Sequence, residues 1–193
     1  MPSLEQAATE AVELLKQKKL RVATAESCTG GLLSKLITDI SGSSAVFDGG
    51  VVSYSNGVKA KVLGVENAML ERYGAVSRPV AAEMAAGTRE LIESDIGVGI
   101  TGIAGPESDS TNKPVGLVYI ALCDGESVWL KELSNDYHGG SVREKNREAS
   151  ALAALDLIKR YAGAYPEKAE GSVELNKLLE KYRKERRGDD GNI

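Results

Sequence analysis

The chain of 193 residues has few of the side chains that bind soft metals. It contains two cysteines, Cys28 and Cys123, and one histidine, His138. Three such ligands are too few for a structural zinc site of cysteine and histidine, and one histidine excludes a His-Glu-x-x-His metalloprotease helix. Two cysteines also exclude a disulfide framework.

The chain has no excess of positive charge and no long apolar run. Lysine and arginine number 24 against 28 acidic residues, which gives a net charge of −4. No general basic field is therefore available for nucleic acid or an anionic membrane. No stretch approaches the roughly 18 apolar residues of a membrane span, and residues 1–10 lack a signal-peptide pattern. We expect a cytoplasmic protein that binds neither nucleic acid nor membrane, with any anionic ligand held by local groups.

Apolar periodicity predicts helices that alternate with strands. Helices are expected over residues 4–18, 30–40, 56–64, 77–92 and 142–164. Strands are expected over residues 20–25, 46–54, 96–101, 115–123 and 128–133, the last two joined by a hairpin turn at Asp124-Gly125. Asn56 is the expected cap of the short helix that Gly64 ends. This order predicts an α/β fold, a layered mixed β-sheet flanked by helices in a single domain.

The composition changes after Pro166, where charged residues dominate. Leucines at 175, 178 and 179 and Tyr182 follow at helical spacing. We expect residues 1–165 to form the domain. Residues 166–193 would form a charged, helical extension with a frayed end, docked on its own domain or on a copy of it.

Glycine is abundant, with 21 residues, and it is used where backbone turns tightly or approaches another group. Two of these glycines end the segment Glu26-Ser27-Cys28-Thr29-Gly30-Gly31, which lies between a predicted strand and a predicted helix. Unpaired amides at a helix start can hold a phosphate or stabilise an oxyanion. Ser27 is then either a nucleophile or simply a helix cap, and Cys28 is a weaker candidate nucleophile.

A serine nucleophile needs a group that accepts its proton. His138 lies far along the chain in a loop, where a solvated histidine is ordinary, and Ser27 lacks the Gly-x-Ser-x-Gly elbow. Tyr54 and Lys59 are the better candidates because Tyr54 ends a predicted strand and Lys59 lies about one turn into the next helix. On pattern alone, Lys59 could equally be a solvated surface lysine.

A second glycine-rich region, residues 97–102, matches the letters of a dinucleotide-binding fingerprint. We reject that reading because these residues form the strand itself, and a polar loop follows where the fingerprint needs a helix. The segment Thr101-Gly102-Ile103-Ala104-Gly105 would lie beside Ser27 if the two strands are neighbours. Arg143 and Arg147, one helical turn apart, could reach an anion or be solvated.

Four segments together carry a family resemblance. They are Ala25-Glu26-Ser27-Cys28-Thr29-Gly30-Gly31, Tyr54-Ser55-Asn56 with Lys59, Gly74-Ala75-Val76-Ser77, and Gly99-Ile100-Thr101-Gly102-Ile103-Ala104-Gly105-Pro106 leading to Lys113-Pro114-Val115-Gly116. In order and spacing, over about residues 4 to 160, they closely resemble the CinA carboxyl-terminal domain family. Members of that family deamidate nicotinamide mononucleotide to nicotinic acid mononucleotide and ammonia without a metal.

The resemblance implies that Ser27 is the nucleophile and that Tyr54 and Lys59 activate it. It also implies a free-standing, cofactor-free homo-oligomer acting on a nucleotide. The implied substrate-binding residues are Glu26, Cys28, Thr29, Gly30, Gly31, Thr101, Gly102, Ala104, Gly105 and Arg143.

One segment departs from the family pattern. An aromatic-x-Gly-Asp-Arg sequence usually precedes the last helix, whereas this chain has Tyr137-His138-Gly139-Gly140-Ser141-Val142-Arg143. Ser141 stands at the arginine position unless Arg143 replaces it from a shifted register. A non-catalytic nucleotide-binding or assembly module, and an amidase for another carboxamide, therefore stay open as alternatives.

Overall fold

A six-stranded mixed sheet forms the centre of the computed structural model, which describes residues 3–108 and 111–185. The strand order is β2-β1-β3-β4-β5-β6. β1 is parallel to β2 and β3, whereas β4, β5 and β6 each run antiparallel to the preceding strand. The strands are β1 (Val22–Glu26), β2 (Phe47–Val52), β3 (Ile96–Gly102), β4 (Leu117–Cys123), β5 (Ser127–Ser134) and β6 (Ser172–Glu174).

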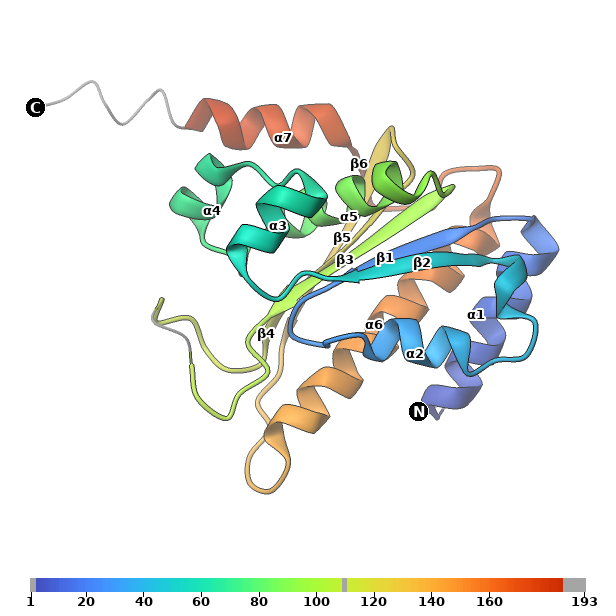
Figure 1. Ribbon diagram of the computed structural model, residues 1–193, viewed down its shortest axis with the longest axis horizontal. Helices are drawn as coiled ribbons and strands as arrows, with labels where there is room; N and C mark the ends of the chain where they lie inside the picture. The colour runs from blue at the N-terminus through green and yellow to red at the C-terminus, as the bar shows by residue number, and fades with distance from the viewer. Residues whose placement is uncertain (1–2, 109–110, 186–193) are drawn as a thin grey trace, which may run out of the picture.

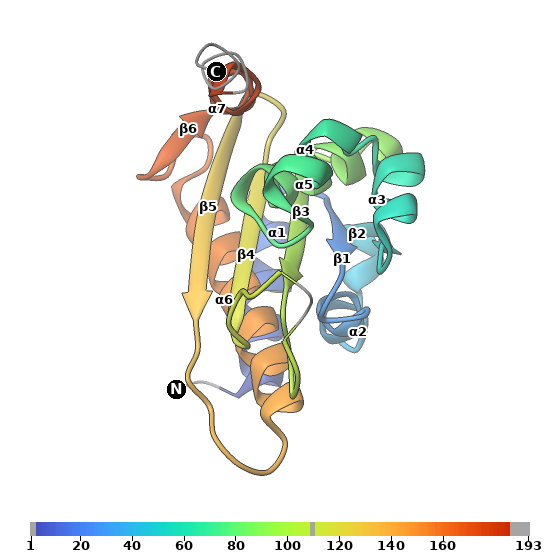
Figure 2. The ribbon, with the colours of Figure 1, turned by 90° about the vertical axis from the view of Figure 1, so that its left-hand side faces the viewer.

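Helices cover both faces of the sheet (Figures 1 and 2). One face carries α1 (Leu4–Lys18), α2 (Leu32–Thr38) and α6 (Val142–Ala164). The other carries α3 (Asn56–Leu63), α4 (Asn67–Tyr73), α5 (Arg78–Ile92) and α7 (Leu175–Lys184). The predicted single-domain α/β architecture is confirmed. In the part of the chain that the structure describes, no helix is long and apolar enough to cross a membrane.

Local capping explains where α3 begins and ends. Ser55, and not Asn56, is the cap, because the extended Ser55 backbone lets its hydroxyl accept the Val58 N–H at 3.3 Å. Gly64 ends the helix in the left-handed conformation, as predicted. The cap therefore lies one residue earlier than the sequence suggested. This shift leaves Lys59 in the first turn of α3.

Glycines in β3 allow α5 to approach the sheet closely. A Cβ atom at Gly97 would lie 2.1 Å from the Ala85 carbonyl oxygen, and one at Gly99 would lie 2.5 Å from that of Ala81. Neither position could carry a side chain without displacing the helix. The rejection of a dinucleotide-binding fingerprint is therefore supported, since these glycines serve helix–strand packing.

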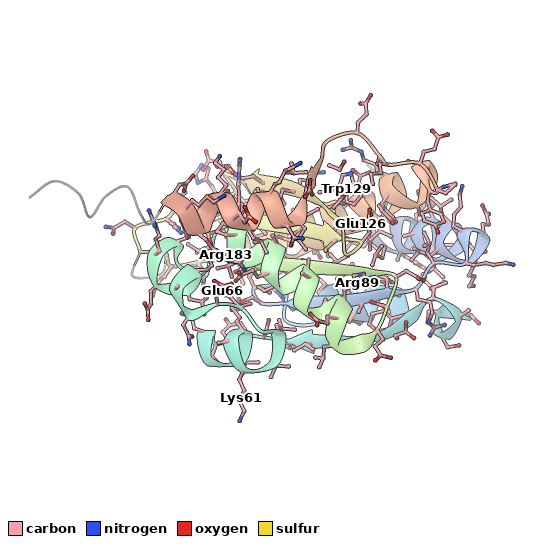
Figure 3. All side chains as sticks on the ribbon, turned by 90° about the horizontal axis from the view of Figure 1, so that it is seen from above. Lys61, Glu66, Arg89, Glu126, Trp129 and Arg183 are labelled. Carbon is pink, nitrogen blue, oxygen red and sulfur yellow. The ribbon has the colours of Figure 1, made fainter. Side chains whose placement is uncertain are left out.

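The extension after α6 docks on the chain's own sheet. β6 pairs with β5, and Leu175 and Leu179 of α7 are buried against α5. Arg183 Nε donates to a Glu66 carboxylate oxygen at 3.0 Å, and Figure 3 shows the two residues side by side. β6 was not predicted because three residues show no periodicity. The expected frayed end falls on residues 186–193, outside the described residues.

Candidate active site

A cavity lies where the parallel strands β1 and β3 end. Glu26 pairs with Ile100 in the last register of the two strands, and the Ser27 N–H donates to the Ile100 carbonyl at 3.0 Å. The segments that follow the two strands therefore lie side by side, as expected for neighbouring parallel strands. The cavity has a volume of about 340 Å³, within the range of small-molecule sites.

Nine of the thirteen predicted site residues line this cavity. They are Ser27, Cys28, Tyr54, Lys59, Thr101, Gly102, Ala104, Gly105 and Arg143. The other four do not line it: one is the last residue of β1, and three belong to the turn before α2. They are Glu26, Thr29, Gly30 and Gly31.

Lys59 is buried at the base of the cavity, with 1% of its surface exposed. Its Nζ lies 3.0 Å from Ser27 Oγ, 2.8 Å from the Ser53 carbonyl oxygen and 3.2 Å from the Tyr54 carbonyl oxygen. All three partners are uncharged oxygen atoms. Burial lowers the pKa of the Lys59 ammonium from its ordinary 10.5 to about 8.

The three partners also suit the neutral form of Lys59. A neutral amine has two N–H groups and one lone pair. The two carbonyl oxygens can only accept, so they take the N–H groups and leave the lone pair for the Ser27 hydroxyl. The same arrangement therefore holds the lysine before and after it takes a proton from Ser27.

Cys28 and His138 are poor alternatives to this pair. Burial raises the pKa of the Cys28 thiol to about 12, so almost none of it is the reactive thiolate at neutral pH. His138 lies on the surface, where its Nε2 is 3.1 Å from an Asp136 carboxylate oxygen. Ser27 remains the candidate nucleophile.

Glu26 occupies the start of α2 with its own carboxylate. The buried carboxylate accepts the N–H groups of Gly31 at 3.1 Å, Leu33 at 3.0 Å and Ser34 at 2.8 Å, and the Ser34 hydroxyl at 2.7 Å. These amides are therefore not free to bind a ligand anion. Because the protein supplies the anion at this helix start itself, these bonds do not support the expected ligand contacts of Glu26 and Gly31, which stay predictions.

The turn between Ser27 and α2 keeps two amides free. The Gly30 N–H donates to the Ser27 carbonyl at 3.1 Å. Arg147 donates to the Thr29 carbonyl through Nε at 3.1 Å and Nη2 at 2.7 Å, so it braces the turn and is not simply solvated. Within residues 3–108 and 111–185, the Thr29 N–H has no hydrogen-bond acceptor, and the Cys28 N–H has none beyond the sulfur of its own side chain. These two donors lie directly after Ser27.

Arg143 closes the mouth of the cavity. Its Nη1 donates to the Gly105 carbonyl at 3.0 Å and its Nη2 to the Tyr54 hydroxyl at 3.2 Å. Tyr54 is 63% exposed, so its side chain lies at the mouth and its carbonyl oxygen at the base, beside Lys59. The geometry separates the two residues that the sequence grouped as activators of Ser27.

A model of the CinA C-terminal domain family matches residues 4–162. This chain belongs to that family. A CinA-like protein of Desulfovibrio desulfuricans is 47% identical over 160 residues, which are 82% of this chain and 37% of that protein. A CinA-like protein of Syntrophomonas wolfei is 51% identical over 141 residues, 73% of this chain and 33% of that protein. The chain spans about a third of the length of the curated relatives it matches.

Solved CinA structures share the fold. The competence/damage inducible protein CihA of Agrobacterium tumefaciens has a TM-score of 0.76 and 39% identity, over 82% of this chain and 94% of that one. A CinA superfamily protein of Klebsiella pneumoniae has a TM-score of 0.79 and 28% identity, over 85% of this chain and all of that one. The family comparison thus agrees with the architecture of the sheet and helices.

The CinA cavity also contains residues that the sequence reasoning missed. Their side chains are mostly small or apolar, so no chemical signal marked them beforehand. Gly74-Ala75-Val76-Ser77 was noticed only as part of the family resemblance. The additional lining residues are Ala75, Val76, Glu107 and Ser108.

Proposed function

We propose that this chain is a serine amidohydrolase that deamidates nicotinamide mononucleotide to nicotinic acid mononucleotide and ammonia. The observation that carries the proposal is the 3.0 Å contact between the buried Lys59 amine and the Ser27 hydroxyl. A Ser–Lys pair needs no metal to form a nucleophile. The substrate is taken from the resemblance to the CinA family.

In the first step, neutral Lys59 accepts the proton of Ser27 while the serine oxygen attacks the carboxamide carbon. The carbonyl oxygen of the substrate gains the negative charge. The N–H groups of Cys28 and Thr29 stand next to the nucleophile and are the proposed oxyanion donors. Glu26 would support this step indirectly, because it holds the start of α2 that follows the turn.

In the second step, the protonated Lys59 gives its proton to the leaving nitrogen, and ammonia departs. An ester between Ser27 and the nicotinoyl group remains. Lys59 then takes a proton from water, which attacks the ester. As the ester bond breaks, the protonated Lys59 returns that proton to the Ser27 oxygen, and the carboxylic acid is released. One water is consumed for each carboxamide, and both Ser27 and Lys59 return to their starting states.

Binding of the nucleotide would use the part of the cavity that residues 101–105 and Arg143 line. Thr101, Gly102, Ala104 and Gly105 form its wall. Arg143 is the cation at the mouth, and its planar guanidinium suits a phosphate. Arg143 would thereby fill the role of the arginine that Ser141 replaces.

The proposal is tested by measuring ammonia and nicotinic acid mononucleotide with the wild type, Ser27→Ala and Lys59→Met. We expect turnover by the wild type and at least a thousandfold loss in both variants, in line with losses of catalytic residues in serine hydrolases. Lys61→Met is the matched control, because Lys61 lies on the exposed side of the same helix and points away from the domain (Figure 3). It should retain wild-type activity.

Each alternative gives a different result. Calorimetric binding of the nucleotide without turnover by the wild type would identify a non-catalytic module. Turnover of another carboxamide, lost in Ser27→Ala, would identify an amidase with a different substrate. Full activity in Ser27→Ala would show that Ser27 is not the nucleophile.

A further inference from the structure

Lys113 spans the two walls of the proposed active-site cavity. One wall is formed by the loop that follows β3, and the other by Ala75 and Val76, in the connection from α4 to α5. Lys113 belongs to the loop, but its half-buried ammonium reaches across to the other wall. Its Nζ lies 2.7 Å from the Tyr73 carbonyl oxygen and 2.6 Å from the Val76 carbonyl oxygen.

The segment 73–76 depends on side chains for its position. Besides the two carbonyls held by Lys113, the Ala75 carbonyl accepts the Thr101 hydroxyl at 2.8 Å. The Tyr73 hydroxyl donates to the Tyr182 carbonyl of α7 at 2.9 Å on the opposite side. Four hydrogen bonds, to β3, the loop and α7, thus hold the end of α4 and the connection after it.

Lys113 is suited to this position by its charge. Tyr73 is the last residue of α4, where helix carbonyls carry partial negative charge and favour a cation. Hydrogen bonds from an ammonium to carbonyl oxygens are stronger than those between neutral groups. The two oxygens lie on either side of Gly74 and Ala75, so one ammonium joins both ends of the turn that places Ala75 and Val76 in the cavity wall. Within the turn, the Ser77 hydroxyl also donates to the Gly74 carbonyl at 2.9 Å.

We propose that Lys113 is a positioning residue that sets the distance between the two cavity walls and so the fit of the substrate. This inference rests on the proposed function, because the fit concerns the nucleotide carboxamide. Lys113 does not contact Ser27 or Lys59, so its loss should affect substrate binding more than proton transfer.

The test compares Lys113→Met and Lys113→Arg with the wild type and with Lys61→Met. We expect Lys113→Met to raise KM about tenfold or more, since two hydrogen bonds from a charged group are lost. The acid-side pKa of the pH–rate profile should stay unchanged. Lys113→Arg keeps a cation that can reach carbonyl oxygens and should recover most of the lost affinity.

Hydrogen exchange in the free protein gives a readout that does not depend on activity. The Gly74 amide, which donates to the Leu70 carbonyl at 3.0 Å, should exchange faster in Lys113→Met than in the wild type, with Lys61→Met unchanged. Unaltered exchange together with unaltered KM would overturn the positioning role. Faster exchange in a protein whose wild type turns over no carboxamide would support the positioning role and reject the proposed function instead.

Discussion

Lys59 should make the reaction strongly pH-dependent near pH 8. Burial lowers the pKa of Lys59 to about 8, so roughly one-tenth of the lysine is neutral at pH 7, half at pH 8 and nine-tenths at pH 9. Because kcat/KM reports the free enzyme, we expect kcat/KM for nicotinamide mononucleotide to rise about tenfold from pH 7 to pH 9. A lysine with the ordinary pKa of 10.5 would give about a hundredfold rise over the same interval.

The assay measures initial rates of ammonia release at low substrate concentration and constant ionic strength. The range starts at pH 7 because a phosphate monoester loses its second proton near pH 6. Blanks without enzyme correct for alkaline breakdown of the substrate. A rate that stays constant between pH 7 and pH 9 would show that Lys59 is not the proton acceptor. A hundredfold rise would show that burial does not lower its pKa.

Three further predictions concern stability and are measured by urea unfolding. Gly99→Ala should destabilise the fold by about 3 kcal/mol, because the new Cβ would meet the Ala81 carbonyl at 2.5 Å and push α5 from β3. Glu26→Ala should also remove about 3 kcal/mol, since one buried and two partly buried amides lose their acceptor. Burial raises the pKa of Glu83 from 4.5 to about 7. The contribution of protonated Glu83 to the free energy of unfolding is therefore fully present below pH 4.5 and is lost as the pH rises through 7. Glu83→Gln keeps the acceptor for the Glu66 N–H at 3.0 Å and should be more stable than wild type by up to about 3 kcal/mol at pH 8, with little difference at pH 4.5.

Matched variants separate these effects from general sensitivity to substitution. Gly57→Ala places a methyl group in α3 where the nearest atom is 4.0 Å away, and it should not destabilise the protein. Glu90→Gln changes an exposed carboxylate on the same helix as Glu83 and should not alter the pH dependence. Equal losses in Gly57→Ala and Gly99→Ala would contradict the packing argument. A Glu83→Gln advantage of the same size at pH 4.5 and pH 8 would contradict the titration argument.

The alternation of helices and strands was readable because it depends on local periodicity. The hairpin at Asp124-Gly125 and the stop at Gly64 were readable for the same reason, since turn chemistry acts over a few residues. The place of Ser27 followed from one general property of α/β sheets, the shared edge at which parallel strands end. β6 could not be predicted from the sequence, because these three residues form a strand only through their pairing with β5.

The partners of the site side chains could not be read in the same way. Glu26 looked like a ligand-binding carboxylate until its bonds to the start of α2 were visible. Tyr54 and Lys59 stood together in the sequence, yet one side chain lies at the cavity mouth and the other at its base. No pattern in the sequence around Lys113 predicted that its ammonium contacts the Tyr73 and Val76 carbonyl oxygens.

The sequence by itself determined the order of most helices and strands, the family and the chemical types of the candidate residues. Only the tertiary structure decided which of them act together. Ser27 and Lys59 are 32 positions apart, and their contact exists because β1, β2 and α3 pack around one edge of the sheet. The lowered pKa of Lys59 is likewise a property of burial, which depends on every element around the cavity and on no short stretch of chain.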